Sequence, residues 1–144
     1  MQNTWQITRL SQGELTLDLL PGIGGRLWNI VFNGQPVLFN NPDLIGCIPD
    51  IKALGDLPTR SPQFGFPLWG GEKTWVAPDR SWEGGTPYPM LDSGPYEIAS
   101  HNADQVVMRS AVCPISHLQI QRGVRLISDN AWSIDHTLIN RGDI

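Results

Sequence analysis

Aromatic and charged side chains are concentrated in one stretch of the chain that is also rich in proline and glycine. The segment "FPLWGGEKTWVAPDRSW", residues 66–82, holds three of the six tryptophans. Sugars present apolar C–H faces ringed by hydroxyl groups, so a site for them combines flat aromatic rings with carboxylates, amides or cations. This mixture predicts carbohydrate binding. In the alternative interpretation, the tryptophans are a structural cap and the charged groups are solvated. The candidate ligand-binding residues of the region are Trp69, Glu72, Lys73, Trp75, Asp79, Trp82, Asp92 and Tyr96.

Candidates for acid–base chemistry are fewer. His101 and His117 lie next to turns, where we expect them to be exposed, whereas His136 lies in a β-like run on its apolar face. Its neighbour Asp135 points to the opposite face, because side chains alternate along a strand, so an Asp–His pair is not expected. His136 and Glu72 are therefore weak catalytic candidates. The sequence shows no nucleophile elbow, phosphate loop or metal-ligand spacing, and we expect neither a metal nor a cofactor.

The elements that would position these residues are predicted to be strands. In "GELTLDLL" Leu15, Leu17 and Leu19 share one face, which is the period of a half-buried strand. Asn33-Gly34 lies between two apolar runs and predicts a tight hairpin. The segments "ADQVVMRSAVC", "HLQIQRGVRLIS" and "AWSIDHTLIN" predict an antiparallel meander. The sequence therefore predicts an all-β fold, an antiparallel β-sandwich, with no amphipathic helix.

Between these two sets of strands, residues 40–95 have a different character. Nine of the twelve prolines fall there, and no hydrophobic period is visible. Its aromatic content argues against disorder, so we expect an ordered excursion with short strands, packed over a sheet. We therefore treat residues 1–144 as one β-sandwich domain that carries this excursion. The glycine-rich stretch at 22–25 is interpreted as a turn rather than a nucleotide loop, because no helical pattern follows it.

The net charge, the lack of long apolar runs and the two cysteines indicate which partners and which compartment to expect. The 144 residues carry a net charge of −4 and no basic stripe, so a nucleic-acid partner is not expected. No apolar run reaches the roughly 20 residues of a membrane helix, and no signal-peptide pattern opens the chain. We expect a cytoplasmic protein in which Cys47 and Cys113 are free thiols.

The last predicted strand ends shortly before Ile144, where the pattern suggests that another strand should follow. An unpaired long edge strand invites aggregation and is normally protected. Two explanations are open. The chain is a piece of a larger domain, or a second copy covers the edge in a homodimer.

Several motifs, taken in order, resemble the galactose mutarotase-like (aldose 1-epimerase-like) superfamily, in its N-terminal half. They are "LDLLPGIGGRLWNIVFNGQPVLF", "LWGGEKTWVAPDRSW" followed by "YPMLDSGPYE", and "WSIDHTLINRGD". The Gly-Gly-Arg turn that ends in Arg26 and the Asp-x-Gly-Pro-Tyr pattern are the features shared with an uncharacterised branch of that superfamily. The resemblance implies a large antiparallel supersandwich with a sugar site on its concave face, and it adds Arg26 to the candidate sugar-binding residues.

The same resemblance implies ring-opening epimerisation by a histidine acid and a glutamate base. In the superfamily both normally lie after the Asn turn, in a second half that this sequence lacks, and Trp69 stands where the relatives have a histidine. The resemblance therefore implies a carbohydrate-binding domain without the complete epimerase machinery, with a sugar or oligosaccharide as its ligand. The alternatives are an aldose 1-epimerase-like isomerase and a non-enzymatic, dimeric structural or interaction domain.

Overall fold

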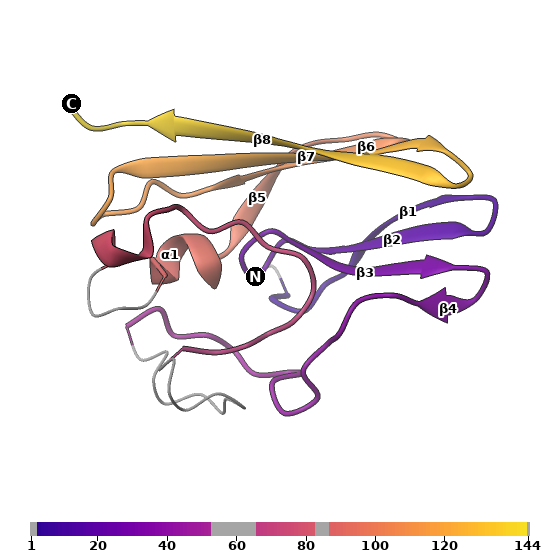
Figure 1. Ribbon diagram of the computed structural model, residues 1–144, viewed down its shortest axis with the longest axis horizontal. Coiled ribbons are helices and arrows are strands. Elements are labelled where there is room, and N and C mark those ends of the chain that lie inside the picture. Colours follow the sequence, from indigo (N-terminus) through magenta and orange to yellow (C-terminus); the bar gives the residue numbers. More distant parts are fainter. Residues whose placement is uncertain (1–2, 53–65, 83–86, 144) are drawn as a thin grey trace.

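A computed structural model describes residues 3–52, 66–82 and 87–143, and it contains two antiparallel four-stranded sheets (Figure 1). The first sheet consists of β1 (Thr8–Gln12), β2 (Leu15–Leu20), β3 (Arg26–Phe32) and β4 (Gln35–Pro36), in that order. The second consists of β5 (Tyr96–His101), β6 (Gln105–Ser110), β7 (Leu118–Ser128) and β8 (Ala131–Asn140), also in chain order. The all-β sandwich predicted from the sequence is confirmed.

The main core lies between the two sheets. Alternate leucines of β2 are buried, as their period of two predicted, and they belong to the same cluster as Val106 and Met108 of β6. From β7, Ile120 and Val124 enter this cluster. Removal of apolar surface from water stabilises such a contact by roughly 25 cal/mol per Å². The two sheets are therefore held face to face by their inward side chains.

The predicted hairpin joins β3 to β4. Asn33 and Gly34 both have positive φ, 49° and 74°, and Phe32 pairs with Gln35. Two successive residues with positive φ define the type I′ turn, whose twist matches that of the flanking strands. The Asn-Gly signal is confirmed.

The predicted meander is confirmed and extended by β5, which pairs with β6. Within the described part of the chain, β8 pairs only with β7 and forms an edge of the sheet. Arg122 of β7 lies opposite His136 of β8 in this pairing. The long edge strand expected from the sequence is therefore present.

The excursion between the sheets has little regular structure in its described parts, 40–52, 66–82 and 87–95. An isolated bridge between Leu27 and Glu72 ties it to the first sheet, and a second bridge, between Asn40 and Gly70, joins two parts of the excursion. The short strands expected there are absent from these parts, which contain instead the 3₁₀ turn η3 (Asp79–Ser81) and the short helix α1 (Pro89–Asp92). Proline explains the difference, because it lacks the N–H that a ladder needs but suits the first position of a helix, where Pro89 stands.

A glycine turn connects β2 to β3 and brings the excursion close. Gly24 and Gly25 have φ of 66° and 55°, as a turn requires. A side chain at Gly25 would lie 2.4 Å from the ring of Tyr96, so the first strand of the second sheet packs directly on this turn. The interpretation of this segment as a turn is confirmed, and it places Arg26 at the junction of the two sheets.

Tryptophans form a second, smaller core on the other side of the first sheet. Trp28 of β3 and Trp69 of the excursion belong to it, with Trp5 packed against both rings. The indole N–H of Trp5 donates to the carbonyl of Cys47 at 2.7 Å, which fixes the chain after β4. Cys47 is half-buried and Cys113 is buried, and both are free thiols, as predicted.

No helix in the described ranges has the length and apolar character needed to cross a membrane.

Candidate functional site

A buried carboxylate organises the region where the excursion meets the sheets. Asp92, the last residue of α1, is 3% exposed, and Arg26 at the start of β3 is fully buried. The Arg26 guanidinium donates to Asp92 Oδ1 at 3.0 Å and to the Gly70 carbonyl at 3.0 Å. Burial lowers the pKa of Arg26, while the negative charge of Asp92 opposes that shift. This ion pair ties the glycine turn, the Gly-Gly pair and α1 together.

The same carboxylate orients an exposed aromatic ring. The indole N–H of Trp75 donates to Asp92 Oδ1 at 2.8 Å, while the ring remains 40% exposed. Phe66 and Trp82 flank this ring edge-on, with centroids 5.4 Å and 5.2 Å from it. Trp82 is itself fixed by donation from its indole N–H to the Val76 carbonyl at 2.7 Å. The three rings therefore form a rigid aromatic corner.

This aromatic corner borders a hollow of about 820 Å³. Such a volume lies within the range of small-molecule sites, roughly 300–1,000 Å³. The hollow is lined by Phe66, Leu68, Trp75, Val76, Ala77, Pro78, Asp79, Arg80 and Trp82. Apolar surface is combined there with one exposed carboxylate and one exposed guanidinium, both from η3.

Lys73 places an amine on the Trp75 ring. Its Nζ lies 3.5 Å from the centroid of that ring, 5.5 Å from the centroid of Phe66 and 4.0 Å from Asp92 Oδ1. Burial lowers the pKa of Lys73 to about 8, the negative charge of Asp92 opposes this shift, and the positive charge of Arg26 adds to it more weakly. The Lys73 side chain is still 25% exposed.

A second ion pair lies beside the first. Arg122 of β7 is fully buried and donates to the Gly25 carbonyl at 2.6 Å and to the Glu72 carboxylate. Glu72 also donates its backbone N–H to the Leu27 carbonyl at 2.8 Å, and its side chain is 31% exposed. A half-exposed carboxylate of the excursion is thereby linked to the middle of the second sheet.

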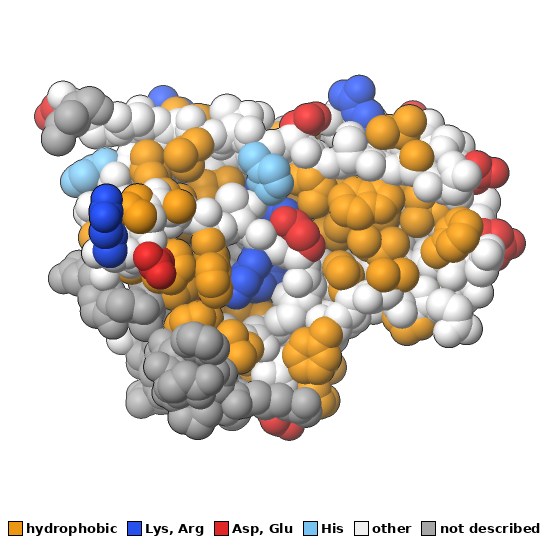
Figure 2. All heavy atoms as spheres, viewed as in Figure 1, with side chains coloured by type: hydrophobic (Ala, Val, Ile, Leu, Met, Phe, Trp, Pro, Cys, Tyr) orange, Lys and Arg blue, Asp and Glu red, His pale blue; other side chains and the backbone are white. Residues whose placement is uncertain are grey.

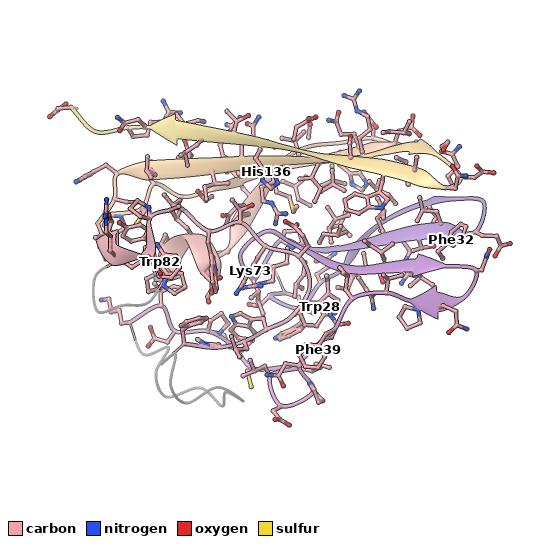
Figure 3. The ribbon with its side chains drawn as sticks, viewed as in Figure 1. Trp28, Phe32, Phe39, Lys73, Trp82 and His136 are labelled. Carbon is pink, nitrogen blue, oxygen red and sulfur yellow. The ribbon has the colours of Figure 1, made fainter. Side chains whose placement is uncertain are left out.

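His136 completes this group from the edge strand. Its Nδ1 lies 2.9 Å from Thr74 Oγ1, and its strand partner is Arg122. Burial and the positive charge of Arg122 lower the pKa of His136, so the ring is neutral at pH 7. Figure 3 shows His136 and Lys73 on one face of the molecule. On the same face, Figure 2 shows basic, acidic and histidine side chains together between hydrophobic patches. We call Glu72, Lys73, Thr74 and His136 the polar seam.

The structure sorts the predicted ligand-binding residues into two sets. Glu72, Lys73, Trp75, Asp79 and Trp82 retain exposed or half-exposed side chains around the hollow and the polar seam.

Arg26, Trp69, Asp92 and Tyr96 are buried, so they cannot touch a ligand at the surface in this structure and support the exposed set from inside. Trp69 donates to Ser93 Oγ at 2.9 Å, and Tyr96 donates to the Leu91 carbonyl at 2.9 Å. Burial raises the pKa of Tyr96, which keeps its hydroxyl protonated as a donor.

The exposed positions expected for His101 and His117 are confirmed. The two weak catalytic candidates, His136 and Glu72, both lie next to Arg122, which the sequence reasoning missed. A signal was present, because the alternation from Ile120 to Val124 puts position 122 on the inner face, and a buried arginine needs acceptors. Phe66, Thr74 and Arg80 were also not predicted as site residues.

Comparison with models of protein families, with curated proteins and with solved structures finds no significant match to this chain. Within the described residues, no group of three or more His, Cys, Asp or Glu side chains has the arrangement of a metal site.

Proposed function

We propose that this chain binds a carbohydrate at the hollow beside Trp75. The observation that carries the proposal is an exposed indole ring whose position is fixed by a buried carboxylate. A ring held in this way offers a flat apolar surface without the entropy cost of ordering it on binding. The apolar C–H face of a pyranose fits such a surface.

Polar groups at the border of the hollow supply what the hydroxyls of a sugar require. Asp79 and Arg80 lie on the exposed turn η3 and line the hollow, so one can accept and the other donate hydrogen bonds. The Lys73 amine lies over the Trp75 ring, and its side chain is 25% exposed. A purely apolar ligand would leave these charges without partners, which favours a polyhydroxylated ligand over a lipid-like one.

Isothermal titration calorimetry with a panel of aldoses, their methyl glycosides and short oligosaccharides tests the proposal. We expect heat of binding with a Kd of about 1 mM or tighter for at least one compound, which corresponds to about −4 kcal/mol. The panel includes non-reducing glycosides so that recognition of the ring is read without any chemistry at the anomeric carbon. Absence of binding heat across the panel would overturn the proposal.

Aldose 1-epimerase-like catalysis is the second candidate, and a specific observation favours it. Arg122 binds the Glu72 carboxylate and lies opposite His136 in the β7–β8 pairing, so a carboxylate and a neutral imidazole lie near the same cation. Mutarotation needs an acid and a base on opposite sides of a ring-opening step, and a neutral histidine suits general base catalysis. Both side chains reach the surface, since Glu72 is half-exposed and His136 is exposed.

Polarimetry separates this candidate from binding alone. We expect fresh α-D-glucose or α-D-galactose to approach anomeric equilibrium at the rate of buffer, because the Glu72 carboxylate is already engaged by Arg122. Acceleration that disappears in both His136→Ala and Glu72→Gln would assign catalysis to the polar seam instead.

A further inference from the structure

The Lys73 amine has an unusual environment for a lysine at the surface. Its Nζ lies against the face of Trp75 and near Phe66, and among the described residues it forms an ion pair with Asp92 at 4.0 Å. A strong charge-assisted hydrogen bond would need a separation of about 2.7–2.9 Å. The Trp75 face and the charge of Asp92 both favour the ammonium form, but burial of the amine is the largest effect and lowers its pKa to about 8 in spite of Asp92.

The Asp92 carboxylate also accepts hydrogen bonds from three other side chains. Its Oδ1 accepts from Arg26 and Trp75, and its Oδ2 accepts from Ser93 Oγ at 3.1 Å. Arg26 also brings a second positive charge into the same region, and it lowers the pKa of Lys73 along with burial. An amine placed between aromatic rings and beside a guanidinium is the environment of lysines that act as nucleophiles.

We propose that Lys73 is a nucleophilic amine that captures an aldehyde as an imine at the polar seam. The inference rests on the proposed function only for the natural ligand, which would be the open-chain aldehyde of an aldose. The reactivity of the amine itself depends on its contacts with Trp75, Phe66, Asp92 and Arg26, and small aldehydes test it directly.

The reaction balances without any oxidant or metal. The uncharged Lys73 nitrogen attacks the carbonyl carbon, a C–N bond forms as the C=O π bond breaks, and one proton passes from the nitrogen to the carbonyl oxygen to give a carbinolamine. That hydroxyl then leaves with the remaining proton of the nitrogen as water, and a C=N bond is left. The protons that these steps take up and release are exchanged with solvent, which reaches the Lys73 side chain because it is 25% exposed.

The chain supplies its own control, because it contains only two lysines, Lys52 and Lys73. Lys52 is exposed and lies near the first end of the excursion. The full chain is treated with glycolaldehyde and sodium cyanoborohydride at pH 7, and peptide mapping reads the hydroxyethyl group at each lysine and at the N-terminal amine separately. The lysine pKa of about 8, compared with 10.5, increases the uncharged fraction at pH 7 by about 300-fold, part of which is offset by weaker intrinsic nucleophilicity.

We expect initial labelling of Lys73 to be at least about tenfold faster than that of Lys52. Trp75→Phe keeps an aromatic wall and should retain the preference, whereas Trp75→Ala should reduce it. Equal labelling of the two lysines, or faster labelling of Lys52, would overturn the inference. Because methyl glycosides cannot open, their binding by calorimetry together with equal lysine labelling would refute the inference while leaving the proposed function in place.

Discussion

Asp92 accepts the indole N–H of Trp75 at 2.8 Å while it forms a buried ion pair with Arg26 at 3.0 Å. One carboxylate oxygen thus links the exposed ring beside the hollow to the interior junction of both sheets. The geometry explains why the predicted site residues separate into a buried set and an exposed set. The buried residues fix the orientation of the exposed ones.

Asp92→Asn should destabilise the protein by about 3 kcal/mol. The change leaves the buried Arg26 guanidinium without its counter-charge, and breaking one partner of a buried pair typically costs about 3–5 kcal/mol, of which the amide oxygen recovers part. Urea unfolding followed by tryptophan fluorescence measures the free energy of unfolding. Asp79→Asn, on the exposed turn, is the matched control and should change it by less than about 0.5 kcal/mol. Similar values for both variants would contradict the role assigned to Asp92.

Glu72→Gln should lower the pKa of His136 further. The negative charge of Glu72 raises the pKa of His136 against the larger effects of burial and Arg122, so its removal leaves only the weaker charge of Asp135 to oppose them. An NMR titration of the His136 ring protons measures the shift. Asp135→Asn is the control and should have a smaller effect in the same direction, since the influence of Asp135 is weaker than that of Glu72. A pKa that stays constant or rises in Glu72→Gln would show that Glu72 and His136 are not coupled.

Lys73 should give the free energy of unfolding a positive slope above pH 8. Its pKa is about 8 in the folded state and 10.5 as a free side chain, so between these values the unfolded chain binds more protons. Stability from this group therefore rises with pH in that interval and is flat below it. The difference in unfolding free energy between the native protein and Lys73→Met should grow from pH 8 to about pH 9.5, below the range in which tyrosine ionises.

Lys73→Arg is the control for this slope. Arginine keeps its charge throughout the interval, so the variant should lack the slope as Lys73→Met does. A slope that persists in either variant would assign it to another group.

The strands were predictable because their signal is local. The alternation of leucines in β2 and of Ile120 and Val124 in β7 needs only the geometry of one strand and a buried face. Asn33-Gly34 was equally informative, since few residue pairs tolerate the backbone of a type I′ turn.

The candidate site was predictable only in composition. Trp69 and Trp75 lie six residues apart in the same irregular segment, yet one ring is fully buried and the other is 40% exposed. No period distinguishes them, because their positions are fixed by Ser93 and Asp92, which lie 24 and 17 residues away. The acceptors of Arg122, at Gly25 and Glu72, likewise come from other parts of the chain, so its partners could not be predicted although its inward position could.

The most direct test of the carbohydrate site compares the sugar affinity of Trp75→Ala with that of Phe32→Ala. Both aromatic side chains are 40% exposed, but Phe32 lies at the end of β3, on the opposite side of the molecule from Trp82 (Figure 3). Calorimetric titration with the tightest-binding compound of the sugar panel should show that Trp75→Ala weakens affinity by at least about tenfold, roughly 1.4 kcal/mol, whereas Phe32→Ala leaves it unchanged. Equal affinities for native protein and Trp75→Ala would contradict the claim that this ring forms the carbohydrate site.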